Sequence, residues 1–559
     1  MIVIVLILHI SACLSLNFQN GRGMRLQADS PYIRELEALS TGIKNKFFFP
    51  GHNGGIHAPS GLSDAIHDGA LQLDLPELDG LGNVHDFSLA SDDALSRALK
   101  AAASLYEAAR TWFLVNGSTS GILIAALVLK ELHTQRLEIE GKSGKKSVII
   151  ISRDAHKAVF DALELSQSEA LVLPCDIDDC YGISRGPDLA LGRITKIIHD
   201  FRRDNGDKAD IAGIIITRPT YQGLGLRGED FKVAVGECHE AGVPVVVDEA
   251  HGSHWHFLPE DEGYGDALSC GADLVIQSSH KTLGALSQAG MLHLSETAFS
   301  CGDGRGRSSA AEEVVHHFYS MLTTTSPNSL LLASLDAART RAEREGPSLV
   351  AATATAVRDL KESVTSCCGS GNVSFLDSTD SHVVDPLRLS VHFPRYPSSA
   401  MAIDEWLCEQ RGLWCELNLP RCIVYCVPMG ATETHLLPLR EGLCGVLQRV
   451  ELPAFETGTK DERQASSSRS DFGEGLLYMP AIRRKNAVSV PTEEALGMIS
   501  AENVVPYPPG IPILLRGEKI SAGHMYKLRE LRKMVRDKAW GGSVLSTDQF
   551  LVSLSVYEH

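Results

Sequence analysis

Short apolar runs alternate with helical patterns between residues 111 and 282, and this alternation constrains the fold more than any other feature of the chain. Each run is short and ends in a polar turn, which is typical of strands that are buried on both faces. Strands that alternate with helices predict the α/β class, with a mostly parallel sheet and helices on both of its faces. The expected strands are TWFLV (111–115), VIIIS (148–152), ALVLP (170–174), GIIIT (213–217), VPVVVD (243–248) and LVI (274–276).

Polar side chains stand at or just beyond the ends of these runs. They are Ser118, His156, Thr217, Asp248 and Lys281. In open α/β sheets, ligands bind in the crevice outside the carboxyl ends of the strands. We therefore expect one site at this edge of the sheet, built from several strands.

Lys281 ends the segment Ser278-Ser279-His280-Lys281, and small residues follow it. An ammonium group is rarely buried without a partner, and a desolvated lysine amine is a nucleophile that forms Schiff bases near neutral pH. Small neighbours would let a flat ligand lie against the backbone. In isolation, the same four residues would also fit a lysine that simply reaches solvent from the end of a strand.

The segment NGSTSG (116–121) is expected to be a turn, followed by an apolar helix from about Ile122. A helix N-terminus preceded by small hydroxyl residues presents free backbone N–H groups and a positive dipole end, which suit a phosphate. Simple N-capping by Ser118 or Thr119 is the alternative. The later GKSGKKS (141–147) is not a Walker A loop, because it precedes a strand instead of following one.

Other functional classes fit the sequence poorly. The net charge of −18 argues against generic binding of nucleic acid. The DEAH sequence at 248–251 lacks the P-loop that an ATPase would need. His251, His254 and His256 would not all face one point at a strand end, so no metal site is predicted. The 13 cysteines are scattered, with no paired CxxC, and indicate reduced structural thiols.

A phosphate-type turn, a carboxylate after one strand and a lysine after the next are what pyridoxal phosphate chemistry needs. At these residues the chain resembles the Orn/Lys/Arg decarboxylase family of fold-type I pyridoxal-phosphate enzymes. The matching stretches are FPGHNGG, NGSTSG, RDAHK, TRPTYQG, VVVDEAHGSHW, SSHKTLGALSQ, TSPNSLLLASLDAAR and PYPPGIPILLRGE. They run in family order from about Phe49 to Glu518. Asn53 and Arg516 depart from the usual family residues, and the flavodoxin-like N-terminal domain of the large bacterial enzymes is lacking.

The resemblance implies roles for individual residues. Lys281 would form the Schiff base with the cofactor, and Asp248 would pair with the ring nitrogen. His156 and Ala250 would lie against the two faces of the ring. The residues expected at the phosphate are Ser118, Thr119, Ser278 and His280, together with Thr325 and Ser326 acting across a subunit interface. The PYPPGIP loop (506–512) and Glu518 are expected near the substrate entrance, together with His251.

The resemblance also implies the reaction, which is decarboxylation of arginine, lysine or ornithine to an amine of the polyamine pathway. Arginine and lysine are preferred, because short members of the family are mostly associated with them. A homodimer or higher homo-oligomer is expected. An aminotransferase, an aldolase or a non-catalytic paralogue is the alternative.

The expected domain organisation has five parts. They are a signal or transit segment (1–28), an arm with the large cofactor-binding domain (29–345), a small α/β domain (346–456), a linker (457–475) and a C-terminal decarboxylase domain (476–559). Residues 1–16 are apolar, residues 1–28 contain no acid, and the segment predicts routing to a plastid or the secretory pathway. The alternative is a cytoplasmic protein that starts at Met24. No stable membrane insertion of the mature protein is expected.

Overall fold

A computed structural model of the chain describes residues 30–43, 48–50, 52–59, 61–62, 66, 68–89, 92–178, 180–299, 308–396, 400–449, 476–479, 487–507, 509–536 and 543–557. The expected leader (1–28) and linker (457–475) lie outside these residues. Among the helices described, none is both long enough and apolar enough to cross a membrane.

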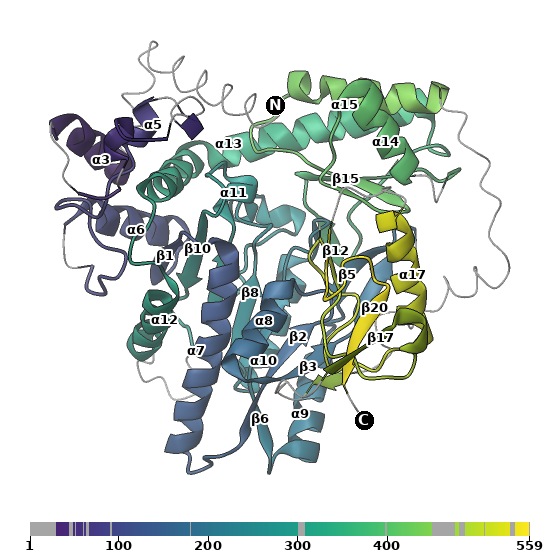
Figure 1. Cartoon of the computed structure of the whole chain (residues 1–559), viewed down its shortest axis with the longest axis horizontal. Helices are drawn as coiled ribbons and strands as arrows, with labels where there is room; N and C mark the ends of the chain where they lie inside the picture. Colours follow the sequence, from purple (N-terminus) through teal and green to yellow (C-terminus); the bar gives the residue numbers. More distant parts are fainter. Residues whose placement is uncertain are drawn as a thin grey trace.

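An eight-stranded sheet forms the centre of the molecule (Figure 1). In order across the sheet, its strands are β1 (Arg110–Leu114), β10 (Gly290–Leu294), β9 (Leu274–Gln277), β8 (Val245–Asp248), β6 (Ala209–Thr217), β2 (Lys146–Ser152), β3 (Glu169–Leu173) and β16 (Leu477–Met479). Strands β9, β8, β6, β2 and β3 are parallel, whereas β10, β1 and β16 enter through antiparallel pairs. The prediction of an α/β fold with a mostly parallel sheet is confirmed.

Helices cover both faces of this sheet. The helices of the large domain are α6 (Ala94–Leu105), α7 (Gly117–Ile139), α8 (Lys157–Ser166), α9 (Arg193–Asn205), α10 (Gly228–Glu240), α11 (Ser279–Thr282) and α12 (Ser308–Leu322). Side chains alternate along a strand, so the two faces of β2 enter different cores. Ile149 and Ile151 pack with α7 and α8, while Val148 and Ile150 pack with α9 and α10.

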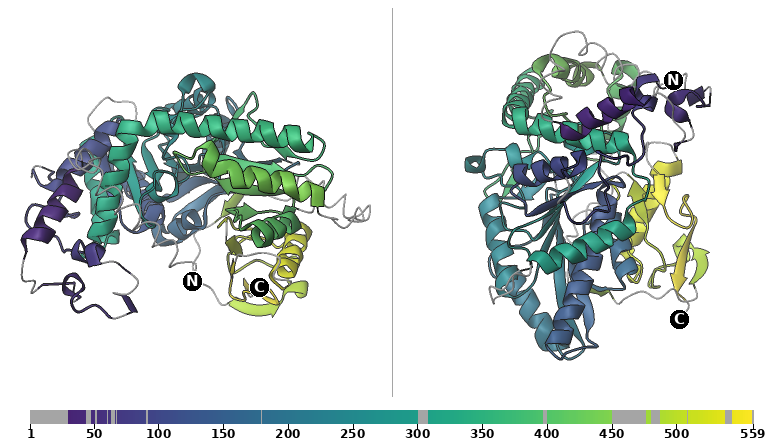
Figure 2. Two further views of the ribbon diagram at one scale, coloured as in Figure 1. Left: turned by 90° about the horizontal axis from the view of Figure 1, so that it is seen from above. Right: turned by 90° about the vertical axis from the view of Figure 1, so that its left-hand side faces the viewer.

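One long helix joins the large domain to the small one. Helix α13 (Ser329–Cys368) spans 40 residues, and the Asn328 side chain caps its start by accepting hydrogen bonds from two backbone N–H groups. Its first half packs in the core of the large domain and its second half in the core of the small domain. Figures 1 and 2 show it running along the top of the molecule. The domain boundary expected at residue 346 therefore falls inside a continuous helix.

The small domain is an antiparallel sheet with two helices beside it. Its strands, in sheet order, are β11 (Ser374–Phe375), β13 (Arg388–His392), β15 (Cys422–Cys426) and β14 (Leu417–Asn418), and its helices are α14 (Ala400–Arg411) and α15 (Glu433–Arg449). Two small two-stranded antiparallel sheets lie between the domains. They pair β4 (Cys175–Asp178) with β5 (Ile183–Pro187), and β7 (Leu224–Leu226) with β12 (His382–Val384).

The N-terminal arm and the C-terminal domain lie at opposite sides of the large domain in the view from above (Figure 2). The arm carries α3 (Pro31–Gly42) and α5 (Asp68–Gln72). The C-terminal domain carries α17 (Ala522–Arg536) and two two-stranded antiparallel sheets, β17 (Ala487–Pro491) with β20 (Ser553–Tyr557), and β18 (Val505–Tyr507) with β19 (Ser543–Leu545). Its strand β16 extends the large sheet beside β3.

Helix α7 lies very close to the sheet at Gly121. A Cβ atom at this position would be 2.8 Å from both Ile276 Cγ2 and Leu114 Cδ1, closer than carbon atoms pack. Glycine therefore sets the distance between the start of α7 and strands β1 and β9. The helix also begins earlier than expected, at Gly117 instead of Ile122, so Ser118 and Thr119 lie in its first turn.

We expect Gly121→Val to lower the free energy of unfolding by about 1–3 kcal/mol, because the added carbons overpack the contact between α7 and the sheet. The matched control is Gly236→Ala in helix α10, where an added Cβ meets no atom within 4 Å. That change should leave stability the same or raise it by up to about 1 kcal/mol through helix propensity. Urea unfolding followed by circular dichroism measures both, and equal midpoints for the two variants would contradict the packing argument.

Candidate active site

A pocket of about 240 Å³ opens at the carboxyl ends of β6, β8 and β9. The large domain forms most of its wall, and Tyr507, Pro509 and Ile511 of the C-terminal domain complete it. The predicted site residues that line it are Ser118, Thr119, His156, Asp248, Ala250, His251, His280 and Lys281. Thr217, noted at a strand end, lines it as well.

A short chain of hydrogen bonds determines the protonation state of Lys281. Arg388 Nη2 donates to His251 Nδ1 at 3.0 Å, and His251 Nε2 lies 2.9 Å from Lys281 Nζ. Burial lowers the pKa of His251 well below its ordinary value, and the permanent charge of Arg388 lowers it further. The imidazole is therefore neutral, and because Arg388 has no acceptor, the single ring hydrogen must be on Nε2. That hydrogen is donated to Lys281, which accepts it only as a neutral amine.

The surroundings of Lys281 agree with a neutral amine. Its side chain is exposed because it projects into the open pocket, yet the protein around its nitrogen desolvates the ammonium and lowers its pKa. Arg388 lowers this pKa further, while the carboxylates of Asp248 and Glu416 oppose the shift. The balance gives a lysine suited to nucleophilic attack on a carbonyl group.

Asp248 is buried at the end of β8. Its carboxylate accepts a hydrogen bond from the Ala250 N–H at 3.1 Å. Desolvation raises the pKa of Asp248. The main effect that opposes this rise is the positive charge of a protonated Lys281. When Lys281 is a neutral amine this compensation is lost, so the buried carboxylate requires another cation in the pocket.

His156 is held between helix α8 and the C-terminal domain. Its Nδ1 accepts from the Ala158 N–H at 3.1 Å, so the ring caps α8. Gly510 lies against the other edge of the ring, where a Cβ would be 2.9 Å from His156 Nε2. The Lys157 N–H donates to Gly510 O at 2.8 Å, which fixes this approach. Burial, with nearby Lys281 and Lys157, lowers the pKa of His156 to about 4.

The N-terminus of α7 forms one end of the pocket. The Gly117 N–H donates to Gln288 O at 2.7 Å, and Ser278 Oγ donates to Ser118 Oγ at 2.8 Å. The other N–H groups of this first turn have no partner within the helix. Thr217 Oγ1 is buried without a hydrogen-bond partner among the described residues. These donors suit an anion such as a phosphate group.

The pocket fits the pyridoxal phosphate that the resemblance implies. Its anion-binding end is the start of α7, and its amine nucleophile is Lys281. A protonated ring nitrogen is the cation that Asp248 requires once Lys281 is neutral. His156 and Ala250 both line the cavity, as residues that lie against a ring must do.

Four predicted residues do not line this pocket. Ser278 lies behind it, fully buried, and reaches it only through Ser118. Thr325 and Ser326 are exposed on the loop between α12 and α13. Glu518, expected near the substrate entrance, is instead buried in the C-terminal domain, 3.4 Å from Arg153 and 3.5 Å from His524.

The structure also adds residues that the sequence did not single out. Tyr221 and Gln288 line the pocket, and Arg388 holds His251. Tyr221 belongs to the TRPTYQG stretch and its ring lies 4.7 Å from that of His251. Gln288 has a positive φ of 75°, a feature of its backbone that the sequence does not reveal. Nothing in the sequence around Arg388 distinguishes it from a surface arginine.

Comparison with known proteins agrees with the site. The family described as Orn/Lys/Arg decarboxylase, major domain, matches residues 30–415, and the C-terminal domain of the same family matches residues 478–537. The uncharacterized protein YaaO of Bacillus subtilis is 29% identical over 94% of this chain and 98% of its own length. An arginine decarboxylase of the same organism is 29% identical over 89% of this chain and 92% of its own.

Among solved structures, lysine decarboxylase A from Pseudomonas aeruginosa superposes with a TM-score of 0.72. The match covers 97% of this chain and 82% of that one, at 18% sequence identity. At this identity the likeness establishes the fold alone, which is that of the fold-type I pyridoxal-phosphate enzymes.

The prediction of routing to a plastid or the secretory pathway is wrong. It rested on residues 1–28, which lie outside the described part of the chain. The relatives that match most of the chain come from bacteria, among them Bacillus species. These organisms are bacteria and have no plastids, so the resemblance gives this chain no plastid or secretory destination.

The reaction class and cofactor follow from the family. A decarboxylase family that matches more than half of the chain sets aside the aminotransferase, aldolase and non-catalytic alternatives. Pyridoxal phosphate is the cofactor of this family, and the pocket around Lys281 fits it. The chain belongs to the Orn/Lys/Arg decarboxylase family, and it is a pyridoxal-phosphate-dependent decarboxylase of a basic amino acid.

Proposed function

We propose that the protein decarboxylates arginine, and that Lys281, Asp248 and His156 are its catalytic residues. The observation that carries the assignment of these residues is the contact of Lys281 with His251, which holds a neutral amine beside a buried carboxylate. For the substrate, support comes from the relative named arginine decarboxylase, which is 29% identical over 89% of this chain. The structural neighbour named lysine decarboxylase supports lysine as the second candidate.

Each residue would act at a defined place. Pyridoxal phosphate, when bound, supplies an electron sink for the electrons left on the α carbon as CO₂ departs. Lys281 would hold its carbonyl carbon and be displaced by the amino group of the substrate. Asp248 would keep the proton on the ring nitrogen, and His156 and Ala250 would lie against the ring. Ser118, Thr119 and His280 would hold the phosphate, and Ser278 would act on it only through its hydrogen bond to Ser118.

The pocket favours a cationic substrate. Asp154 lines it, and Glu416 is near enough to raise the pKa of Lys281. The Tyr221 hydroxyl donates a hydrogen bond to Glu416, which connects this carboxylate to the pocket wall. We propose that these two carboxylates attract the distal cation of the substrate, with His251 near the entrance. The net charge of −18 acts in the same direction over longer distances.

The proposal includes a homodimer. Thr325 and Ser326 are exposed in this protomer and outside its own pocket. They would therefore be free to contact the phosphate in a second subunit, as the family resemblance implies. A monomer in sedimentation that is fully active would contradict this part of the proposal.

The test of the function is release of CO₂ from arginine, lysine and ornithine, each supplied separately to the cofactor-loaded protein. We expect arginine to give the highest kcat/KM. Lys281→Ala should release no CO₂ from any of them, because no other lysine lines the pocket among the described residues. Lys232→Ala, on the exposed face of α10, is the matched control. A higher kcat/KM with lysine would replace the proposed substrate, and an active Lys281→Ala would exclude the proposed role.

Asp248→Asn should keep the fold but lower kcat by about 100-fold or more, because an amide does not hold the ring proton as a carboxylate does. Asp230→Asn, on an exposed turn of α10, is the control and should retain wild-type kcat. Steady-state kinetics with saturating cofactor separates this effect from weaker cofactor binding. Wild-type kcat in Asp248→Asn would rule out the role.

His156 should make the cofactor-free protein sensitive to acid. In the unfolded chain a histidine takes up a proton near pH 6.5, whereas folded His156 stays neutral down to about pH 4. Acidification through this window therefore favours unfolding, because the unfolded state binds more protons. We expect the urea midpoint to fall more steeply between pH 7 and pH 4.5 in the wild type than in His156→Gln. His199→Gln, outside the pocket, is the control, and parallel curves for all three proteins would refute the shift.

A further inference from the structure

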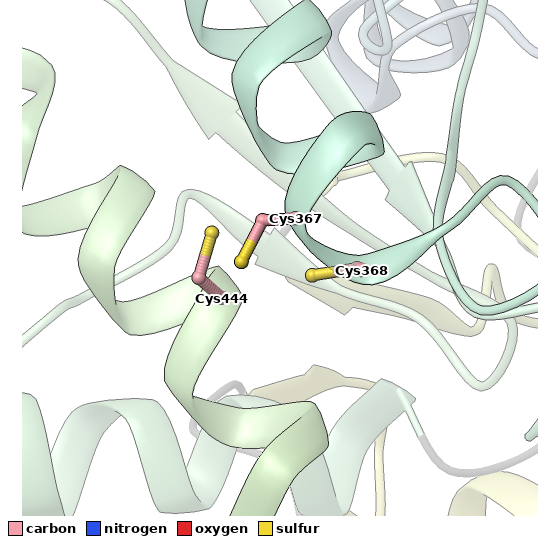
Figure 3. A group of neighbouring side chains, drawn as sticks. All are labelled: Cys367, Cys368 and Cys444. Carbon is pink, nitrogen blue, oxygen red and sulfur yellow. The ribbon is translucent and has the colours of Figure 1, made fainter.

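Three cysteines from two helices converge in the small domain. Cys367 and Cys368 are the last two residues of α13, and Cys444 lies on α15. Their three Sγ atoms all lie within 4.8 Å of one another. Figure 3 shows the sulfur atoms of Cys367 and Cys444 facing each other across the two helices, with Cys368 beside them.

This cluster differs from the isolated structural thiols of the chain. Cys238 and Cys422 are each buried in an apolar core, where a thiol acts as a small hydrophobic group. Cys367 is exposed, and Cys368 and Cys444 are half-buried, so solvent reaches the cluster. Within the described residues, this is the one group of three or more histidine, cysteine or acidic side chains whose ligand atoms all lie within 4.8 Å of one another.

The three thiols contact one another. Cys368 Sγ also donates a long hydrogen bond of 3.8 Å to Leu443 O. Because their Sγ atoms all lie within 4.8 Å of one another, the three cysteines can all bind one cation placed between them.

We propose that Cys367, Cys368 and Cys444 bind one thiophilic d¹⁰ cation of the Zn²⁺ class, with solvent as the fourth ligand. A tetrahedral site with Zn–S bonds of about 2.3 Å places its sulfur atoms about 3.8 Å apart. The Sγ atoms, none more than 4.8 Å from another, are therefore within about 1 Å of the separations of such a site. Binding replaces three S–H bonds by three S–metal bonds, releases three protons to solvent and changes no oxidation state.

The chemistry of the ligands selects the cation. Thiolates are soft ligands and favour zinc and related ions over Mg²⁺ or Ca²⁺, which prefer oxygen. A disulfide between Cys444 and one neighbour would need an external oxidant and would leave the third thiol unused. A bound cation would instead join the end of α13 to α15, and because α13 also packs in the large domain, it would stiffen the connection between the two domains.

The test uses the full chain, loaded with pyridoxal phosphate and kept reduced, and Co²⁺ as the spectroscopic probe. We expect one Co²⁺ per chain with sulfur-to-metal charge-transfer absorbance, displaced by one equivalent of Zn²⁺. Zinc should also raise the unfolding temperature, because a ligand that binds the folded state stabilises it. Cys444→Ser and Cys367→Ser should each weaken binding by more than about 100-fold, since even the loss of an outer-shell partner costs 10–100-fold.

Cys408→Ser, on α14 and outside the cluster, is the matched control and should keep the charge-transfer band. Because Cys367 is exposed, its serine variant should fold even where Cys444→Ser does not. The proposal is overturned if the reduced wild type gives no thiolate band, or if Cys367→Ser binds Co²⁺ as the wild type does. A disulfide to Cys444 in air-oxidised protein, with no cation bound after reduction, would overturn it in favour of a redox pair.

Discussion

The arrangement of the site depends on the contact of Arg388 with His251. Arg388 comes from β13 of the small domain and His251 follows β8 of the large domain, so this one hydrogen bond joins the two domains at the pocket. Gly223 makes the approach feasible, because a Cβ there would be 2.6 Å from Arg388 Cβ. Nearby, His254 lies 2.9 Å from Asp385, with both side chains fully buried. Buried polar pairs of this kind are tolerated only with good geometry, so they fix the domain orientation closely.

Desolvation is the common cause of the proton states in the pocket. It lowers the pKa of Lys281, His156 and His251 and raises that of Asp248. The site thus holds neutral bases around a carboxylate that needs a cation. A cofactor that brings an anionic phosphate, a carbonyl group and a basic ring nitrogen meets each of these groups in turn. These pKa shifts follow from burial, and the contact between the large and small domains contributes to that burial.

The sequence predicted the parts of the fold and site that depend on local pattern. Apolar runs ending in polar residues predicted the parallel sheet, and the structure places Asp248 and Lys281 in one pocket because parallel strands end at one edge. Features set by distant partners were not predicted. Arg388 acts only because the small domain folds over β8, and Glu518 faces Arg153 through packing of the C-terminal domain. Helix α13 passes residue 346 since both cores share it.

The C-terminal domain belongs to the active site as much as the large sheet does. Arg153, at the end of β2, is buried and donates to Pro512 O at 2.6 Å and Ile513 O at 3.1 Å. Three residues later, His156 contacts Gly510 from the same segment. The loop that carries His156 is therefore held on both sides by the C-terminal domain. A buried guanidinium without these carbonyl groups would be strongly unfavourable. The position of His156 therefore depends on the docking of the C-terminal domain.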